Sequence, residues 1–86
     1  MPEISRFFGI IILIFYNDHP PPHFHVRYGE QRAILAIDTL TILEGSLRPR
    51  VLGLVIEWAS MHKDELMENW QRARRQEALE KINPLE

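Results

Sequence analysis

The sequence contains no cysteine, only four glycines, and no apolar run long enough to cross a membrane. The absence of cysteine excludes disulfides and thiolate metal sites and is typical of proteins from a reducing cytoplasm. The longest apolar stretch, residues 7–16, is only half the length of about 20 residues that a membrane-spanning helix needs. We therefore expect a cytoplasmic protein with no membrane partner.

The chain also lacks a large excess of charge of either sign. Its formal net charge is −2, from 10 Lys and Arg against 12 Asp and Glu. This balance argues against a nucleic-acid module that relies on overall positive charge, although it is compatible with a local basic patch. The chain of 86 residues is expected to form a single domain, residues 1–86, because a second core cannot be built from so short a sequence.

The first half of the chain is predicted to form a small antiparallel sheet. Residues 10–16 are β-branched and aromatic without polar alternation, which favours a strand covered on both faces. Residues 23–28 alternate between polar and apolar, and Gly29 predicts a hairpin turn to a strand at residues 32–38. Residues 39–43 are either a fourth short strand or an extended lead-in to a helix. The connections are too short for parallel crossovers.

The second half has helical periodicity. Ser46 is a candidate N-cap, and Pro49 falls in the first turn, where its missing N–H costs little. One helix over residues 47–75 would be about 44 Å long, which exceeds the width of a domain of this size. We therefore expect a break near residues 62–64. The predicted fold is α+β: a three- to four-stranded antiparallel β-meander followed by two C-terminal helices, or one long kinked helix, packed on one face.

The first predicted strand has a consequence for assembly. Two short helices cover only one face of a small sheet, yet residues 10–15 are apolar on both faces. A bare apolar face is an aggregation hazard. We therefore expect the second face to bind another copy or another protein. The alternative is that the N-terminal segment and the C-terminal tail fold over it.

A histidine- and proline-rich segment is the chemically distinctive part of the chain. Histidine ligates metals and transfers protons near neutral pH. On the strand predicted at residues 23–28, His23, His25 and Arg27 share one face of the sheet, and Tyr28 begins on the other. Three prolines precede this strand and are expected to form a stiff polyproline II segment. The row of two imidazoles and one guanidinium is the candidate functional site.

One interpretation of this segment is a metal site. His19, His23 and His25 lie within seven residues and would supply three nitrogens to a zinc or nickel ion, with one position left open for water. Asp18 would serve as a fourth ligand or as a hydrogen-bond partner of a ligand. The spacing of two between His23 and His25 is the feature that favours this interpretation, because it places both rings on one face.

Two other interpretations remain open. Metal-free cleavage of RNA needs a base, an acid and a cation, and His23 or His25, Tyr28 and Arg27 are the right residue types. Alternatively, the histidines are packed structural residues whose ring N–H groups bond carbonyls, as in an adaptor protein without catalysis. Whether the protein is an enzyme stays open at this point.

Most of the chain resembles a known family. Residues 2–30, which include NDHPPPHFHVRYGE, residues 43–73 and the ending INPLE resemble the bacterial family called domain of unknown function 4160. One departure is Pro20, where the family pattern has asparagine, so this position lacks a side-chain amide. The family motif covers the positions His19, His23, His25, Arg27 and Tyr28.

The resemblance implies a partner but no activity. Family members are commonly encoded beside a protein of the domain of unknown function 2442 family, in pairs described as toxin–antitoxin modules. Our leading hypothesis is therefore a component of such a two-gene module, which binds its cognate partner through the sheet face and, if it is the toxin, cleaves RNA with no cofactor. The alternatives are a small metal-binding or regulatory protein without catalysis, and a purely structural adaptor.

Overall fold

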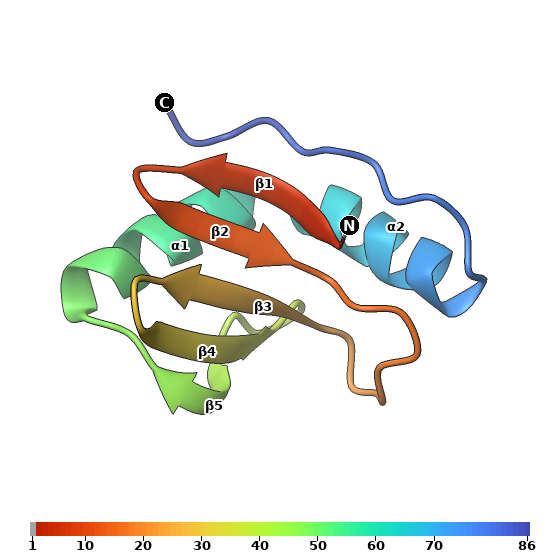
Figure 1. Ribbon diagram of the computed structural model, residues 1–86, viewed down its shortest axis with the longest axis horizontal. Coiled ribbons are helices and arrows are strands. Elements are labelled where there is room, and N and C mark those ends of the chain that lie inside the picture. The colour runs from red at the N-terminus through yellow and green to blue at the C-terminus, as the bar shows by residue number, and fades with distance from the viewer. Residues whose placement is uncertain (1) are drawn as a thin grey trace.

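The computed structural model describes residues 2–86 as a five-stranded antiparallel sheet with two helices on one face (Figure 1). The strands lie side by side in chain order: β1 (Glu3–Phe7), β2 (Ile10–Leu13), β3 (His23–Tyr28), β4 (Gln31–Ala36) and β5 (Ile42–Ser46). Helices α1 (Pro49–Met61) and α2 (Lys63–Arg74) follow. The predicted α+β class, the antiparallel order and the break between two helices are confirmed, whereas the sheet has five strands rather than three or four.

The strand that the sequence analysis missed is β1, which pairs with β2 across a tight turn at Phe8 and Gly9. Both turn residues have positive φ, 51° and 79°. A two-residue turn of this type needs left-handed backbone at both positions, which glycine adopts freely and a bulky residue rarely does. The apolar run around Phe8 therefore concealed the turn. The strand predicted at residues 10–16 also ends early, at Leu13.

Helix α1 begins at Pro49, which occupies the first turn as predicted. Ser46 is not its N-cap, because Ser46 is the last residue of β5. The N-cap is Arg48, whose backbone N–H donates to Oε1 of Gln31 at 2.9 Å. Neither helix in residues 2–86 combines the length and the apolar character that crossing a bilayer requires.

The core lies between the helices and one face of the sheet. The alternation predicted for β3 is confirmed, because Phe24 and Val26 are buried in the core whereas Arg27 is exposed. Trp58 of α1 is fully buried and its ring lies 5.3 Å from that of Phe7, centroid to centroid. The sheet is thus held to the helices by large apolar side chains on one face only.

The other face of the sheet is turned toward the viewer in Figure 1, and no helix or loop of residues 2–86 passes in front of it. We call it the open face. Ile11 of β2 is half-buried on it between two arginines, since it is paired with Arg6 on β1 and with Arg27 on β3. The open face is therefore mixed rather than bare and apolar. A partner on this face stays a prediction.

The C-terminal segment, residues 75–86, contains neither helix nor strand, and its later part runs along β1 (Figure 1). The backbone N–H of Ile82 donates to the carbonyl oxygen of Ile4 at 2.8 Å, and Nζ of Lys81 donates to that of Glu3 at 3.0 Å. The segment therefore covers the outer edge of β1, and neither it nor the N-terminal segment folds over the open face.

Two glycine substitutions are expected to have effects of opposite sign. Gly45 of β5 has a φ of 82°, and a Cβ atom there would lie 2.2 Å from the backbone oxygen of Arg32. Gly45→Ala should therefore destabilise the protein by about 1–3 kcal/mol. Gly53→Ala in α1, where nothing lies within 4 Å, should stabilise it by about 0.5–1 kcal/mol through helix propensity. Urea denaturation measures both, and a Gly45→Ala midpoint at or above the wild-type value would contradict the close approach of β5 to β4.

Candidate functional site

Two histidines of β3 and an aspartate of the preceding loop converge on one point. Nε2 of His23 lies 3.1 Å from Oδ2 of Asp18, and Nε2 of His25 lies 3.0 Å from the same oxygen. The three ligand atoms lie within 4.8 Å of one another. The spacing of two along a strand places the imidazoles side by side, with ring centroids 5.2 Å apart. We call Asp18, His23 and His25 the Asp-His-His group.

The loop that carries Asp18 is attached to the segment after α2. The hydroxyl of Tyr16 donates to the carbonyl oxygen of Glu77 at 2.9 Å, and Nε2 of Gln76 donates to Oδ1 of Asn17 at 3.0 Å. The Pro20–Pro21 peptide bond is cis, so the three prolines do not form the continuous polyproline II segment that we expected. The two hydrogen bonds made by Tyr16 and Asn17 hold the loop in place and so position the carboxylate of Asp18 before any ligand binds.

Both ring nitrogens of His23 are engaged. Its Nδ1 lies 2.7 Å from the carbonyl oxygen of Pro21, which can only accept, so Nδ1–H donates there. In a neutral ring, Nε2 then carries a lone pair that faces the carboxylate of Asp18 at 3.1 Å. Two acceptors in this position repel each other unless a proton or a metal ion lies between them. The contact between His23 and Asp18 therefore requires a proton or a metal ion between Nε2 and Oδ2.

Aromatic side chains restrain both imidazole rings. The ring of His23 lies against Trp70 of α2, with centroids 5.0 Å apart, and the ring of Phe15 meets that of His25 edge-on at 4.5 Å. The side chain of His23 is 11% exposed, compared with 23% for His25 and 28% for Asp18. The group is thus packed against aromatic rings on its inner side and accessible to solvent through His25 and Asp18.

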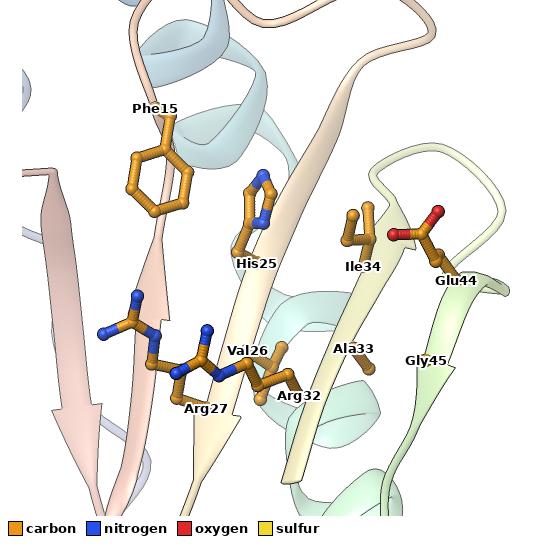
Figure 2. A pocket seen from close by; sticks show the side chains of 9 residues that line it. All are labelled: Phe15, His25, Val26, Arg27, Arg32, Ala33, Ile34, Glu44 and Gly45. Atoms are coloured by element: carbon orange, nitrogen blue, oxygen red, sulfur yellow. The ribbon is translucent and has the colours of Figure 1, made fainter. Parts of the chain in front are cut away.

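The other predicted site residues lie apart from the Asp-His-His group. His19 is exposed on the loop and lines a hollow of about 260 Å³ that Asp18 also borders, but its ring is not among the ligand atoms of the group. Arg27 is on the same face as His25, two residues further along β3 (Figure 2). Tyr28 packs against the core on the other side of β3, so the structure does not bring it to the face that carries His25 and Arg27.

Sequence reasoning underestimated two residues. The sequence predicts Asp18 only as a fourth ligand or hydrogen-bond partner, yet in the structure Asp18 occupies the place next to the two histidines that the sequence predicts for His19. Arg32 was missed, although the predicted hairpin turn at Gly29 places it directly opposite Arg27. Strand pairing would have revealed Arg32 from the sequence, whereas the path of the loop that carries Asp18 could not be predicted.

The sequence model of one protein family, described as "Domain of unknown function (DUF4160)", matches residues 9–71. The match covers more than half of the chain and contains the whole Asp-His-His group, whereas β1 and the C-terminal segment lie outside it. No curated protein and no solved structure matches the chain. The match identifies the family but assigns no chemistry to the Asp-His-His group.

Proposed function

The chain belongs to the DUF4160 family, as its motifs predicted, and we propose that it is a metal-binding protein whose Asp18, His23 and His25 hold one divalent transition-metal ion. Imidazole and carboxylate ligands suit zinc, nickel and iron(II), and the lack of cysteine excludes thiolate ligands. The observation that carries the proposal is Nε2 of His23, which faces a carboxylate oxygen while the Nδ1–H of the same ring donates to a carbonyl.

The distances within the group support a bound ion. In a tetrahedral zinc site with metal–ligand bonds of about 2.0–2.1 Å, two ligand atoms lie roughly 3.3 Å apart. The two nitrogen–oxygen separations in the group, 3.0 and 3.1 Å, are slightly shorter than this value and also fit hydrogen bonds, so the ligand atoms need to move apart by only a few tenths of an ångström to hold an ion. The carbonyl of Pro21 is the kind of partner that a metal-bound histidine usually has on its other nitrogen, where it fixes the tautomer and makes the ligand more basic.

Three protein ligands leave at least one coordination position open. Structural zinc sites are usually closed by four protein ligands, whereas catalytic sites keep a position for water or substrate. An ion bound by the Asp-His-His group would supply a Lewis acid that activates such a water. The solvent-accessible side of the group, formed by His25 and Asp18, is where this position would lie. The arrangement therefore favours a reactive or regulatory ion over a purely structural one.

Metal-free cleavage of RNA receives less support from the geometry. It requires Tyr28 to act with His25 and Arg27, but Tyr28 lies on the other side of β3. The role as a component of a toxin–antitoxin-like pair does not depend on metal binding and stays a prediction from the family resemblance. Co-expression with the neighbouring gene product tests it, and failure of the two proteins to copurify would count against it.

Wild-type protein dialysed against zinc is expected to retain about one ion per chain in elemental analysis and to melt at a higher temperature than protein treated with EDTA. Asp18→Ala and His25→Ala should each weaken zinc binding by about tenfold or more in titration calorimetry, because each removes a ligand. Both side chains are partly exposed, so these variants are better suited to the test than a change at the buried His23.

His19→Ala is the matched control for the metal site. His19 belongs to the three-histidine site predicted from the sequence but lies outside the Asp-His-His group. This variant should bind zinc with wild-type affinity. The proposal would be overturned if His19→Ala weakened binding as much as His25→Ala, or if the wild-type protein bound none of zinc, nickel and iron(II).

A further inference from the structure

Two arginines face each other across the open face. In the antiparallel register of β3 and β4, Arg27 is paired with Arg32, and Figure 2 shows both guanidinium groups on the same side of the sheet. Like charges directly opposite in a sheet are destabilising. Within residues 2–86, neither arginine has a carboxylate within ion-pair distance. The fold thus keeps two adjacent positive charges at a cost in stability.

A third arginine in the same row provides a contrast. Arg6 of β1 is paired with Ile11, whose other neighbour is Arg27. The guanidinium of Arg6 donates to both carboxylate oxygens of Glu3, at 2.8 and 3.2 Å, and these hydrogen bonds hold the pKa of Glu3 below its usual value. The sheet therefore neutralises the outer arginine of the row with an acidic neighbour but not the two inner ones.

The inner arginines border a hollow of about 320 Å³, which is within the size range of small-molecule sites. Phe15 and Ile34 contribute apolar surface to its lining, and Glu44 lies at its far side (Figure 2). Figure 2 places His25 between Phe15 and Ile34, so a ligand in the hollow would meet two positive charges at one end and an aromatic ring, an imidazole and an aliphatic side chain at the other.

We propose that this hollow binds an organic phosphate, with the phosphate group on Arg27 and Arg32 and a planar or apolar body against Phe15 and Ile34. The guanidinium group presents its donors in a flat fork that matches two phosphate oxygens, and two guanidiniums neutralise a dianion. A nucleotide combines this charge with a planar ring that stacks on aromatic side chains, and it is available as a free mononucleotide or as a unit of single-stranded RNA.

The phosphate site lies beside the Asp-His-His group but does not depend on it. His25 belongs to the group and also lines the hollow, so a ligand bound there would lie beside the proposed metal position. Binding should therefore be measured on the full chain after EDTA treatment, which prevents a phosphate from binding through an ion. A failure of the metal proposal then leaves the phosphate test unaffected.

The test is a titration with adenosine monophosphate and, separately, with a short single-stranded RNA, followed by calorimetry or fluorescence anisotropy. At least one of the two should bind saturably, and Arg27→Gln and Arg32→Gln should each weaken that binding by about tenfold or more. Arg6→Gln is the matched control, because it removes the same charge from the same face at a position already paired with Glu3. It should change the affinity by less than about twofold.

The outcomes distinguish a free nucleotide from RNA as the ligand. Binding of adenosine monophosphate would show that a free nucleotide is enough to occupy the site. Tight binding of the RNA alone would show that the site takes a nucleotide within an RNA chain, and either result supports the proposal. If Arg6→Gln weakened binding as much as Arg32→Gln, the attraction would be one of general charge, and the proposal would be overturned. Absence of saturable binding to either compound would overturn it as well.

Thermal stability separates a binding role from a structural one. Without ligand, Arg32→Gln should melt at a higher temperature than the wild type, because the change removes the repulsion between Arg27 and Arg32. At the same concentration, the ligand should raise the melting temperature of the wild type by more than that of the variant. A variant that melts below the wild type without ligand would show that Arg32 serves packing, and the proposal would fail.

Discussion

Trp58→Ala is expected to remove most of the free energy of unfolding of the protein. Trp58 is fully buried on α1, and its ring contacts Phe7 of β1 and Phe24 of β3 at centroid distances of 5.3 and 6.4 Å. Its Nε1–H donates to the carbonyl oxygen of Asn83 at 2.8 Å, so the change also removes one of the hydrogen bonds that hold the C-terminal segment. Removing a side chain of this size from a core costs about 3–5 kcal/mol. The free energy of unfolding of a small domain lies near the low end of the usual range, which is about 5–15 kcal/mol.

Urea denaturation followed by circular dichroism measures the loss. Ile56→Ala is the matched control, since Ile56 lies two positions earlier on the same helix but is 36% exposed. The Ile56→Ala change should lower the free energy of unfolding by at most about 1 kcal/mol. Trp58→Phe should fall between the two, because it keeps most of the ring area but loses the hydrogen bond to Asn83. An unfolding midpoint for Trp58→Ala equal to that of the wild type would contradict the described packing of α1.

Ile82→Ala is expected to lower the free energy of unfolding by about 2–4 kcal/mol, a large effect for a residue outside any helix or strand. Ile82 is 4% exposed and packs into the core, and its backbone N–H is bonded to Ile4 of β1. Asn69 of α2 holds the same segment, because its side-chain amide both donates to and accepts from the backbone of Glu80, each at 2.8 Å. The segment therefore behaves as part of the core.

Asn83→Ala is the control for the C-terminal segment. The side chain of Asn83 is exposed, and its contact with Trp58 is made by the backbone carbonyl, which the substitution leaves in place. The free energy of unfolding of the Asn83→Ala variant should stay within about 0.5 kcal/mol of the wild-type value. If chemical denaturation gave Ile82→Ala the same midpoint as Asn83→Ala, the segment would not be packed on β1 as described.

The sequence predicts best those elements that depend on residues close together in the chain. The residues of β3 were predicted without error, because polar and apolar side chains alternate from His23 to Tyr28 and a glycine turn follows. The break at His62 was predicted from length alone, since one continuous helix would have been longer than the domain is wide. Both inferences rest on the geometry of the chain over a few residues.

The elements that were missed depend on an unusual backbone conformation or on distant partners. The turn before β2 requires a left-handed phenylalanine, Phe8, which residue preferences disfavour. The helix was expected to start after Ser46 because serine is a good N-cap, but the pairing of Ser46 with Arg32 extends β5 instead. In both cases strand pairing outweighed the local preference.

The sequence by itself determined which side chains share a face. It put His23, His25 and Arg27 on one side of a strand and Phe24 and Val26 on the other, because the direction of a side chain along an extended backbone follows from covalent geometry. Its lack of cysteine likewise restricts any metal site to nitrogen and oxygen ligands.

Only the tertiary structure decided which of these side chains meet groups from elsewhere in the chain. The loop before β3 brings Asp18, rather than His19, to the two histidines, and the hairpin register sets Arg27 against Arg32. These contacts depend on the path of a loop and on strand pairing. They join residues from different segments of the chain, so they are determined by the packing of the whole domain and not by the periodicity of any one segment.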